Sequence, residues 1–319
     1  SILRSIFPRP EQAVFDCIEE KYLSDTLGRR KGRAEALVFP ESTEQVSRLL
    51  AYAHENRIPV TPRGAGTNLV GSTVPLDGGI ILDLSHMDRI LELDRDTMTI
   101  TVEPGILLQD LQRYVEERGL FYPPDPGDKE SSIGGNISTN AGGMRAVKYG
   151  VTRDYVRGLE VVLADGTVLQ AGGKCVKDAS GLSLKQLFVG SEGTLAVITK
   201  CILRLIPKPE TSVSVLVPYA DLETGIPSVL AILQAGADPT AVEFIQRKVV
   251  ALGERYSGVQ YPCPEAGSFI LLTFDGRASQ VQESAERVRR VAMEHGAMDY
   301  IVSPIPPGPQ TSGGCGERW

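Results

Sequence analysis

Glycine-rich segments are the part of this sequence whose composition can do chemistry. Of the 33 glycines, 20 lie in residues 60–200, so the middle of the chain must bend tightly or bring its backbone close to a ligand. The first segment is PRGAGTNLVGS, residues 62–72. Consecutive backbone N–H groups in such a turn form a concave nest for an anion, typically phosphate. Taken alone, the segment fits a phosphate nest and a glycine-rich surface turn equally well.

This first segment differs from two common nucleotide signatures. It matches neither G-x-G-x-x-G nor G-x-x-x-x-G-K followed by Ser or Thr, which disfavours an NAD-binding Rossmann site and a P-loop NTPase. Its glycines allow close backbone approach, and three side chains add hydrogen-bond donors: Thr67, Asn68 and Ser72.

Two further segments share this character. SSIGGNISTNAGG, residues 131–143, has two glycine pairs around small polar residues. Such a backbone can wrap a planar ring and bond its polar edge, and Ile133 and Ile137 resemble anchors to a core more than parts of a low-complexity loop. GSEGTLAVI, residues 190–198, is a glycine-flanked turn that enters an apolar strand. Alone it predicts only a turn and a strand.

The elements that must position these segments follow from periodicity and capping. Ser42 and Gln45 form a capping-box pattern, and Gly119 is typical of a helix end. Residues 122–150 carry little periodicity, and Asp165-Gly166 predicts a hairpin turn. Hydrophobic spacing predicts helices over 11–22, 43–56, 107–118, 221–235, 246–256 and 279–295. It predicts strands over 36–39, 59–61, 79–84, 98–102, 159–163, 167–171, 194–205, 213–217, 241–245, 269–274 and 298–302.

The domain organisation changes at Pro207-Lys208-Pro209, after which short strands and helices alternate as in a small α+β sandwich. The last 17 residues contain four prolines and four glycines, too little apolar surface to order themselves. We therefore expect an N-terminal helical segment (1–32), a ligand-binding domain (33–208), a second domain (209–302) and an irregular, disordered tail (303–319).

Composition restricts the class of protein. The 319 residues are 42% hydrophobic and carry a net charge of −7, so there is no basic footprint for nucleic acid or anionic lipid. The longest apolar stretches, such as residues 269–274, are too short to span a bilayer, which predicts no direct membrane insertion. No charged-then-apolar leader opens the chain. Five scattered cysteines without a CxxC pair suit a reducing cytoplasm and predict neither disulfides nor a zinc site.

Scattered titratable residues offer weaker candidates. His54, His86 and His295 lack metal-ligand spacing, and a structural role is favoured for each. Arg63 fits loop support and phosphate contact equally well. The other candidates are Arg145, Lys148 and Arg153 as attractors of an anionic substrate or solvated ion pairs, and Cys175 as a thiol beside two lysines, for which an inert role is favoured.

Together the three glycine-rich segments resemble the FAD-binding domain of the vanillyl-alcohol oxidase (PCMH-type) flavoproteins. The nearest branch is the one that contains the GlcD-type subunit of glycolate oxidase together with D-lactate dehydrogenase. The resemblance runs from about Arg33 to Pro209, includes PPDP and YGVTRDYV (residues 149–156), and continues more weakly to about Val302. The set in this order is far more specific than any single piece. It implies an α+β fold, with a two-part FAD-binding domain followed by an incomplete α+β cap domain.

The resemblance also implies a cofactor site. The diphosphate would lie on the first segment, the isoalloxazine and ribityl side on the second, and the third would close the site. The implied cofactor-binding residues are Pro62, Arg63, Gly64, Ala65, Gly66, Thr67, Asn68, Gly71, Ser72, Pro124, Asp125, Ser131, Ser132, Gly134, Gly135, Asn136, Ser138, Thr139, Asn140, Ala141, Glu192, Gly193, Thr194 and Ile198. Some relatives attach flavin through a His that Thr67 replaces here, so we expect non-covalent FAD.

The implied activity is that of an FAD-dependent dehydrogenase that oxidises a small 2-hydroxy acid, such as D-lactate or glycolate, to the 2-oxo acid by hydride transfer to flavin N5. Electrons would leave to a quinone, an iron–sulfur partner subunit or an electron-transfer flavoprotein. The sequence assigns no catalytic base, no carboxylate-binding Arg and no metal ligand.

Two alternatives stay open. The family's histidines and acidic residues from a later C-terminal segment are missing here, and the tail matches nothing expected at that point, so a truncated or frame-shifted flavin-binding remnant without turnover is one alternative. A non-flavin module that binds an anion with the same turns is the other, less favoured because one nest would suffice for it.

Overall fold

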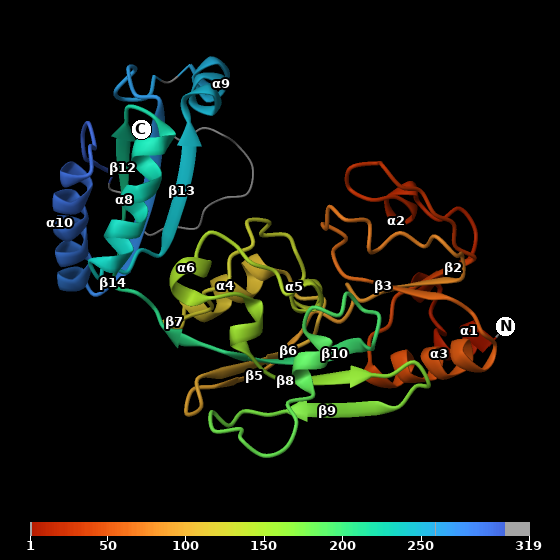
Figure 1. Cartoon of the computed structure of the whole chain (residues 1–319). Helices are drawn as coiled ribbons and strands as arrows, with labels where there is room; N and C mark the ends of the chain where they lie inside the picture. The colour runs from red at the N-terminus through yellow and green to blue at the C-terminus, as the bar shows by residue number, and fades with distance from the viewer. Residues whose placement is uncertain (1, 259, 304–319) are drawn as a thin grey trace. The chain divides into compact units, whose positions relative to one another are not determined.

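The chain packs as two compact units in the computed structural model, which describes residues 2–258 and 260–303 (Figure 1). Unit 1 comprises Ser1–Gly142 and Val151–Ile206, and unit 2 comprises Gly143–Gly150 and Pro207–Trp319. The predicted scheme keeps residues 33–208 together and does not include this transfer of residues 143–150 to unit 2. From residue 304 on, the predicted irregular tail lies outside the described residues.

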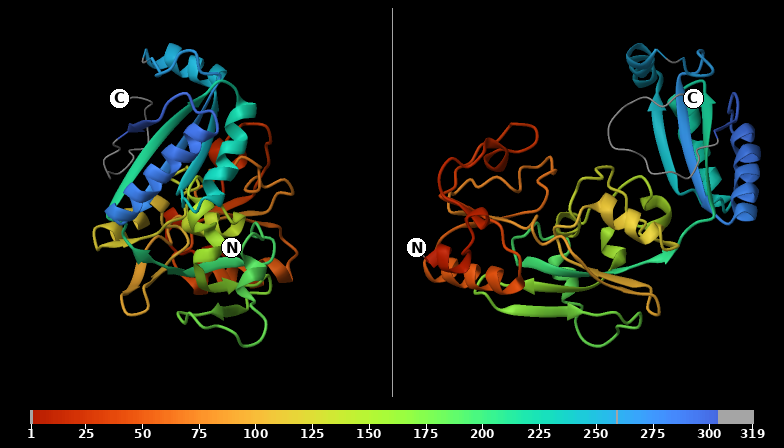
Figure 2. Two further views of the ribbon diagram at one scale, coloured as in Figure 1. Left: turned by 60° about the vertical axis from the view of Figure 1, so that its left-hand side comes forward. Right: turned by 180° about the vertical axis from the view of Figure 1, so that it is seen from behind.

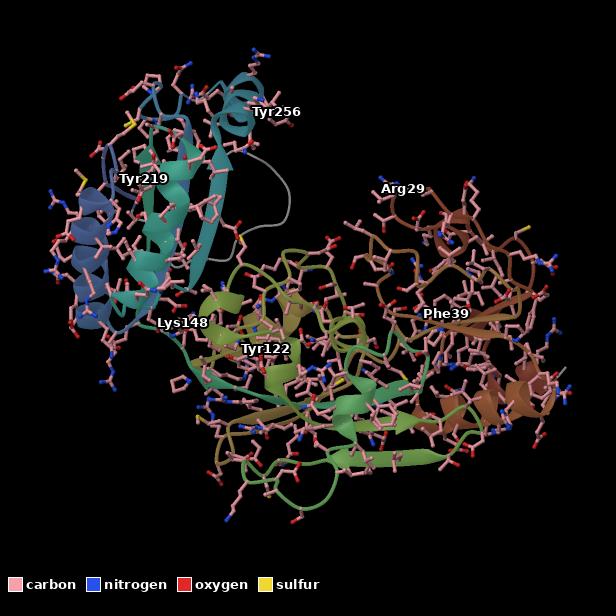
Figure 3. All side chains as sticks on the ribbon, in the orientation of Figure 1. Arg29, Phe39, Tyr122, Lys148, Tyr219 and Tyr256 are labelled. Carbon is pink, nitrogen blue, oxygen red and sulfur yellow. The ribbon has the colours of Figure 1, made fainter. Side chains whose placement is uncertain are left out.

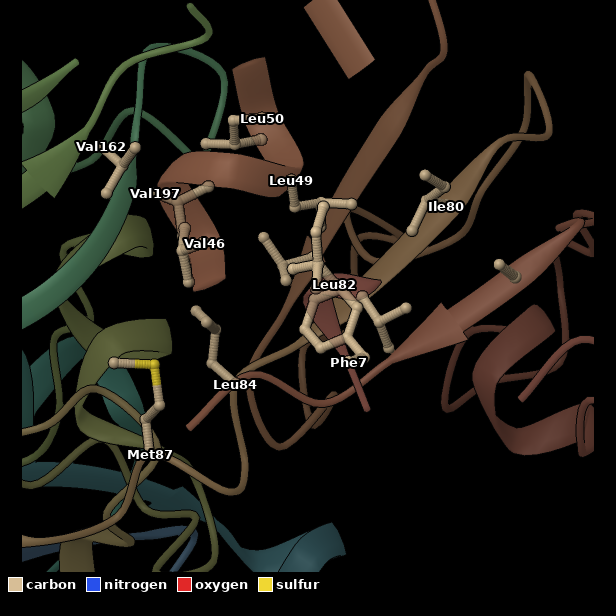
Figure 4. Close-up of a cluster of buried hydrophobic side chains, with 13 residues drawn as sticks. Phe7, Val46, Leu49, Leu50, Ile80, Leu82, Leu84, Met87, Val162 and Val197 are labelled. Atoms are coloured by element: carbon tan, nitrogen blue, oxygen red, sulfur yellow. The ribbon is translucent and has the colours of Figure 1, made fainter. Parts of the chain in front are cut away.

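The first sheet of unit 1 has the order β1-β2-β4-β3, in which β2 (Ala36–Val38), β4 (Ile80–Asp83) and β3 (Val60–Arg63) are parallel. Helix α3 (Thr43–Glu55) connects β2 to β3 and confirms the predicted cap, because the Ser42 hydroxyl accepts from the Gln45 backbone N–H. Its apolar face packs into a core with residues of α1 (Ile2–Ile6) and β4 (Figure 4). This core fixes the end of β3, where the first glycine-rich segment begins.

The predicted helix over residues 11–22 is wrong. The segment forms the short 3-10 helix η1 (Pro10–Gln12), the strand β1 (Ala13–Val14) and the start of α2 (Glu20–Leu23). Ala13 and Val14 pair with Val38 and Leu37 of β2. The edge of β2 thus offers these residues backbone hydrogen bonds, and this non-local pairing overrides the helical spacing of the apolar residues.

The second sheet of unit 1 is antiparallel, in the order β5-β6-β10-β8-β9. Helix α4 (Leu108–Glu116) is confirmed, with Gly119 at φ +75° directly after it. The hairpin of β8 and β9 turns at Asp165-Gly166 as predicted, while β5 was not predicted. The strands of this sheet and the short elements beside it are β5 (Ile90–Asp94), β6 (Thr99–Val102), β8 (Val156–Val162), β9 (Val168–Gly172), β10 (Val197–Arg204), η2 (Thr152–Tyr155) and α7 (Lys185–Phe188). Two further strands, β7 (Leu120–Phe121) and β11 (Ile206–Pro207), pair with each other.

Unit 2 is an antiparallel sheet in the order β13-β14-β12-β15, with α8 (Leu222–Gln234) and α10 (Ala278–Glu294) along one face (Figure 2). That face is apolar because Val215, Leu272 and Val242 lie side by side in register. The predicted helices and the strand–helix alternation are confirmed. The remaining bounds are β12 (Thr211–Tyr219), β13 (Ala241–Gln246), α9 (Arg247–Ser257), β14 (Ser268–Gly276) and β15 (Ile301–Ser303).

No helix among residues 2–258 and 260–303 combines the length and apolar character that crossing a membrane requires.

A buried carboxylate fastens residues 143–150 to the rest of unit 2. Asp275 is 9% exposed, and its Oδ1 accepts from the Lys148 ammonium (2.9 Å), the Tyr149 hydroxyl (2.8 Å) and the Thr240 hydroxyl (2.7 Å). Lys148 (labelled in Figure 3) and Tyr149 belong to the one-turn helix α6 (Ala146–Tyr149). So short a helix has little stability of its own, so this ion pair and hydrogen bonds hold it in unit 2.

Asp275→Asn should destabilise unit 2 by about 3 kcal/mol, since it leaves the Lys148 ammonium without its buried partner. Asp238→Asn is the matched control, because Asp238 lies 3.7 Å from the same ammonium but its side chain is 70% exposed. The control should cost less than about 1 kcal/mol. Urea unfolding of both variants measures this difference, and equal costs would contradict the role given to Asp275.

Candidate functional site: a glycine-lined cavity in unit 1

One cavity of unit 1, with a volume of about 400 Å³, is lined by residues from all three glycine-rich segments. They reach it from separate places in the sequence. The first follows β3, the second includes helix α5 (Ile133–Thr139), and the third enters β10. A volume of this size is typical of a small-molecule site.

The Ser132 hydroxyl joins the first two segments. Its oxygen accepts from the backbone N–H of Ala65 and from that of Gly135, both at 3.3 Å. The second bond is the N-cap of α5, since Ser132 precedes the first helical residue. One side chain of 2% exposure therefore sets both the start of α5 and its distance from the glycine loop.

The sequence predicts no helix in residues 122–150, and the structure corrects this with α5 and α6. Two glycines in a seven-residue helix are unfavourable by propensity. Three features compensate: the Ser132 cap, the burial of Ile133 and Ile137 one turn apart, and the close packing of Gly134 on Pro104. A Cβ at Gly134 would overlap Pro104, so this glycine is required for the packing.

Backbone hydrogen bonds attach the third segment to the end of α5. Gly190 N–H donates to the Ile137 carbonyl (3.0 Å), and Glu192 N–H donates to the Ser138 carbonyl (2.8 Å). Glu192 has φ +55°, a left-handed conformation that is costly for a residue other than glycine and that the turn must impose. A Cβ at Gly193 would lie 3.4 Å from Pro62 Cγ, which brings the third segment against the first. Each segment thus contacts the other two.

Arg63 supports the glycine loop from below. Its guanidinium occupies the space that a Cβ at Gly66 would need, and its Nε lies 3.5 Å from Oδ2 of Asp83. Both side chains are almost fully buried, and burial lowers the pKa of Arg63 and raises the pKa of Asp83, because it disfavours either charged form. The opposite charge of each partner counteracts these shifts. Arg63 is therefore held by Asp83 and shapes the loop, although it also lines the cavity.

The lining fits a planar, polar ligand such as FAD. Asn136 is 5% exposed and lines the cavity, and no described residue pairs with its side-chain amide. Its N–H and C=O groups are thus available to a ligand, and an unused buried amide is costly. Gly64 and Gly66 have no room for a side chain, so the loop exposes backbone there. Asn136 and these two glycines would contact FAD, whose isoalloxazine supplies the hydride acceptor when bound.

The structure brings most of the predicted site residues to this cavity. The nineteen that line it are Pro62, Arg63, Gly64, Ala65, Gly66, Thr67, Asn68, Ser72, Ser131, Ser132, Gly134, Gly135, Asn136, Ser138, Thr139, Ala141, Glu192, Gly193 and Ile198. Asn68 differs from its expected role as a donor to the ligand. Its Oδ1 accepts from the backbone N–H of Val70 and Ser72, and its Nδ2 donates to Thr73, so the side chain organises the loop itself.

Five predicted residues lie outside the cavity wall. Asp125 is ion-paired with Lys129 (2.7 Å), and the carbonyl of Pro124 accepts from Gln112. Asn140 ends α5 in the left-handed conformation. The remaining two hold turns: Thr194, whose hydroxyl donates to the Ser191 carbonyl, and Gly71, whose carbonyl accepts from Val74 N–H.

Six lining residues lie outside the three glycine-rich segments and were not predicted: Thr26, Thr73, Leu84, Pro104, Pro126 and Asp128. Pro126 and Asp128 follow the predicted Pro124 and Asp125 closely, so the PPDP motif pointed to the right segment but the wrong residues. Thr26 comes from the N-terminal segment, and its hydroxyl donates to the Gly66 carbonyl (3.1 Å). No local sequence pattern identifies it.

The scattered candidates do not line this cavity. His86 stacks on Phe39, and the ring of His295 bonds the Val291 carbonyl at the end of α10. Arg145 and Lys148 belong to unit 2. Arg153 donates to the Val189 carbonyl (2.8 Å) and to Gln186, and so supports the third segment. The other two are His54, exposed on α3, and Cys175, an exposed free cysteine.

Comparison with known protein families identifies both parts of the chain. Residues 34–172 match the FAD binding domain, and residues 208–304 match the C-terminal domain of FAD linked oxidases. The chain belongs to the FAD-linked oxidase flavoproteins with a PCMH-type fold, and its cofactor is FAD.

Curated relatives give the nearest named functions. The chain is 42% identical over 278 residues to "Glycolate oxidase subunit GlcD" of Bacillus subtilis (strain 168), which covers 87% of the chain and 59% of that protein. It is 43% identical over 300 residues to "D-lactate dehydrogenase" of Anaerostipes hadrus, with 92% of the chain and 63% of the relative covered. The chain thus spans about three fifths of the length of these relatives.

Solved structures show the same fold at low sequence identity. Alkyldihydroxyacetonephosphate synthase has a TM-score of 0.80 at 20% identity, covering 92% of this chain and 58% of that one. p-Cresol methylhydroxylase has a TM-score of 0.80 at 20% identity, covering 94% and 64%. At this identity the similarity supports the fold and nothing more specific.

Gly64→Ala should weaken FAD binding by about tenfold, because its methyl group displaces the Ser132 hydroxyl and with it the α5 cap. Gly173→Ala is the control in the same unit, since a Cβ there meets nothing within 4 Å. Quenching of flavin fluorescence on titration measures both affinities. An unchanged affinity for Gly64→Ala would show that the contact between Ser132 and the glycine loop does not shape the site.

Proposed function

We propose that the chain is an FAD-dependent dehydrogenase of small 2-hydroxy acids such as D-lactate or glycolate. The observation that carries the proposal is the convergence of three glycine-rich segments on one cavity in a chain related to proteins named for these two activities. The α-carbon would give a hydride to the flavin and the hydroxyl group a proton to a base, leaving the 2-oxo acid. The two electrons would leave to an accepting subunit, an iron–sulfur protein or an electron-transfer flavoprotein.

The domain assignment is part of this proposal. Residues 33–208 would bind the cofactor, with the cavity residues named above as its contacts, and residues 209–302 would form an incomplete substrate cap. The cytoplasm is the proposed location. Compared with a module for another phosphate ligand, a flavoprotein is favoured by the family match over residues 34–172.

Anaerobic addition of D-lactate or glycolate to the FAD-loaded chain should bleach the visible flavin absorbance, and a dye acceptor should restore it. L-lactate serves as the stereochemical control and should bleach the flavin far more slowly. A flavin-coloured chain that neither D-lactate nor glycolate bleaches would contradict the proposed activity and favour a cofactor-binding remnant.

FAD should be bound without a covalent bond. Thr67 lines the cavity at the position where some relatives carry the histidine that attaches flavin, and a hydroxyl group is not a comparable nucleophile. Acid precipitation should therefore release all of the flavin into the supernatant. Flavin that stays with the precipitated chain through washing would contradict this.

A further inference from the structure

The N-terminal segment 22–31 packs along the glycine loop, although the FAD-domain match begins only at residue 34. The contacts recur every fourth residue. The Tyr22 ring lies 5.2 Å from Cζ of Arg63, and the Thr26 hydroxyl donates to the Gly66 carbonyl at 3.1 Å. The Arg30 side chain then covers Gly71, where a Cβ would lie 3.4 Å from Cδ of Arg30.

A tight turn fixes this segment. Asp25 is 7% exposed, and its Oδ1 accepts from the backbone N–H of Arg29 (2.7 Å) and Arg30 (3.1 Å). A bridge between Ser24 and Lys31 closes the turn into a small hairpin. The backbone at Arg30 is therefore held in place before any ligand binds, which limits the entropy lost when its side chain forms a contact.

The charges around the cavity leave a cationic position unfilled. Among the described residues that line it, the one cation is Arg63, and it is already paired with Asp83, while Asp128 and Glu192 bring negative charge. A diphosphate adds further negative charge. Backbone N–H groups supply only partial charges to offset it.

Arg30 is placed to fill that position. Gly71, which it covers, is next to Ser72 in the cavity wall. Within the described part of the chain, its guanidinium has no carboxylate partner inside ion-pair distance. Its neighbour Lys31, in contrast, is already paired with Glu20.

We propose that Arg30 is a further cofactor-binding residue, whose guanidinium donates hydrogen bonds to the diphosphate oxygens of FAD, and that the segment 22–31 is a fourth wall of the site. Arginine suits this role because its planar donors match phosphate oxygens. The inference rests on the proposed use of FAD and adds the residue that neutralises it.

The test compares Arg30→Ala, Arg30→Lys and Arg29→Ala in the full chain by titration with FAD at low and high salt. Arg29 is the matched control, because it has the same charge in the same turn and extends from the outer edge of this loop (Figure 3). Arg30→Ala should weaken FAD binding about tenfold and flatten its salt dependence. Arg30→Lys should recover part of the loss, and Arg29→Ala should change little.

ADP and riboflavin separate the diphosphate from the rest of the cofactor. Arg30→Ala should weaken binding of ADP, which carries the diphosphate, and leave riboflavin, which has none, unaffected. An equal loss for Arg29→Ala and Arg30→Ala, or an equal loss for ADP and riboflavin, would overturn the inference while leaving the use of FAD intact. A wild-type chain that does not bind FAD would overturn both.

Discussion

The hydroxyl group of Ser132 is the interaction on which the geometry of this site depends. It accepts one hydrogen bond from the glycine loop at Ala65 and one from the first turn of α5 at Gly135. The end of α5 then receives the third segment through Gly190 and Glu192. A single buried side chain thus sets the position of one wall, and that wall positions another. Gly64 must lack a side chain for this contact to form.

The electrostatics of the cavity follow from the same economy of side chains. Its walls are mostly backbone and small polar residues, and the buried pair of Arg63 and Asp83 leaves little net charge beneath the glycine loop. An anionic ligand therefore relies on backbone N–H groups and on charge from outside the three segments. The N-terminal segment supplies such a charge at Arg30, on a turn built by Asp25.

The sequence predicted what depends on local pattern and on resemblance. The cap of α3, the end of α4 and the alternation in unit 2 follow from short-range rules, and the glycine segments pointed to one shared site. It failed where partners distant in sequence decide. Residues 13–14 became a strand because β2 offered them an edge, and α5 formed because Gly134 packs on Pro104. Thr26 reached the cavity through a contact forty residues away.

The most direct test of the central claim is amide hydrogen exchange of the full chain with and without FAD. If the cofactor occupies the shared cavity, residues 62–72, 131–141 and 190–198 should all gain protection, with the same dependence on FAD concentration. Protection limited to one of these segments, or appearing at separate FAD concentrations, would contradict the claim that they form one site.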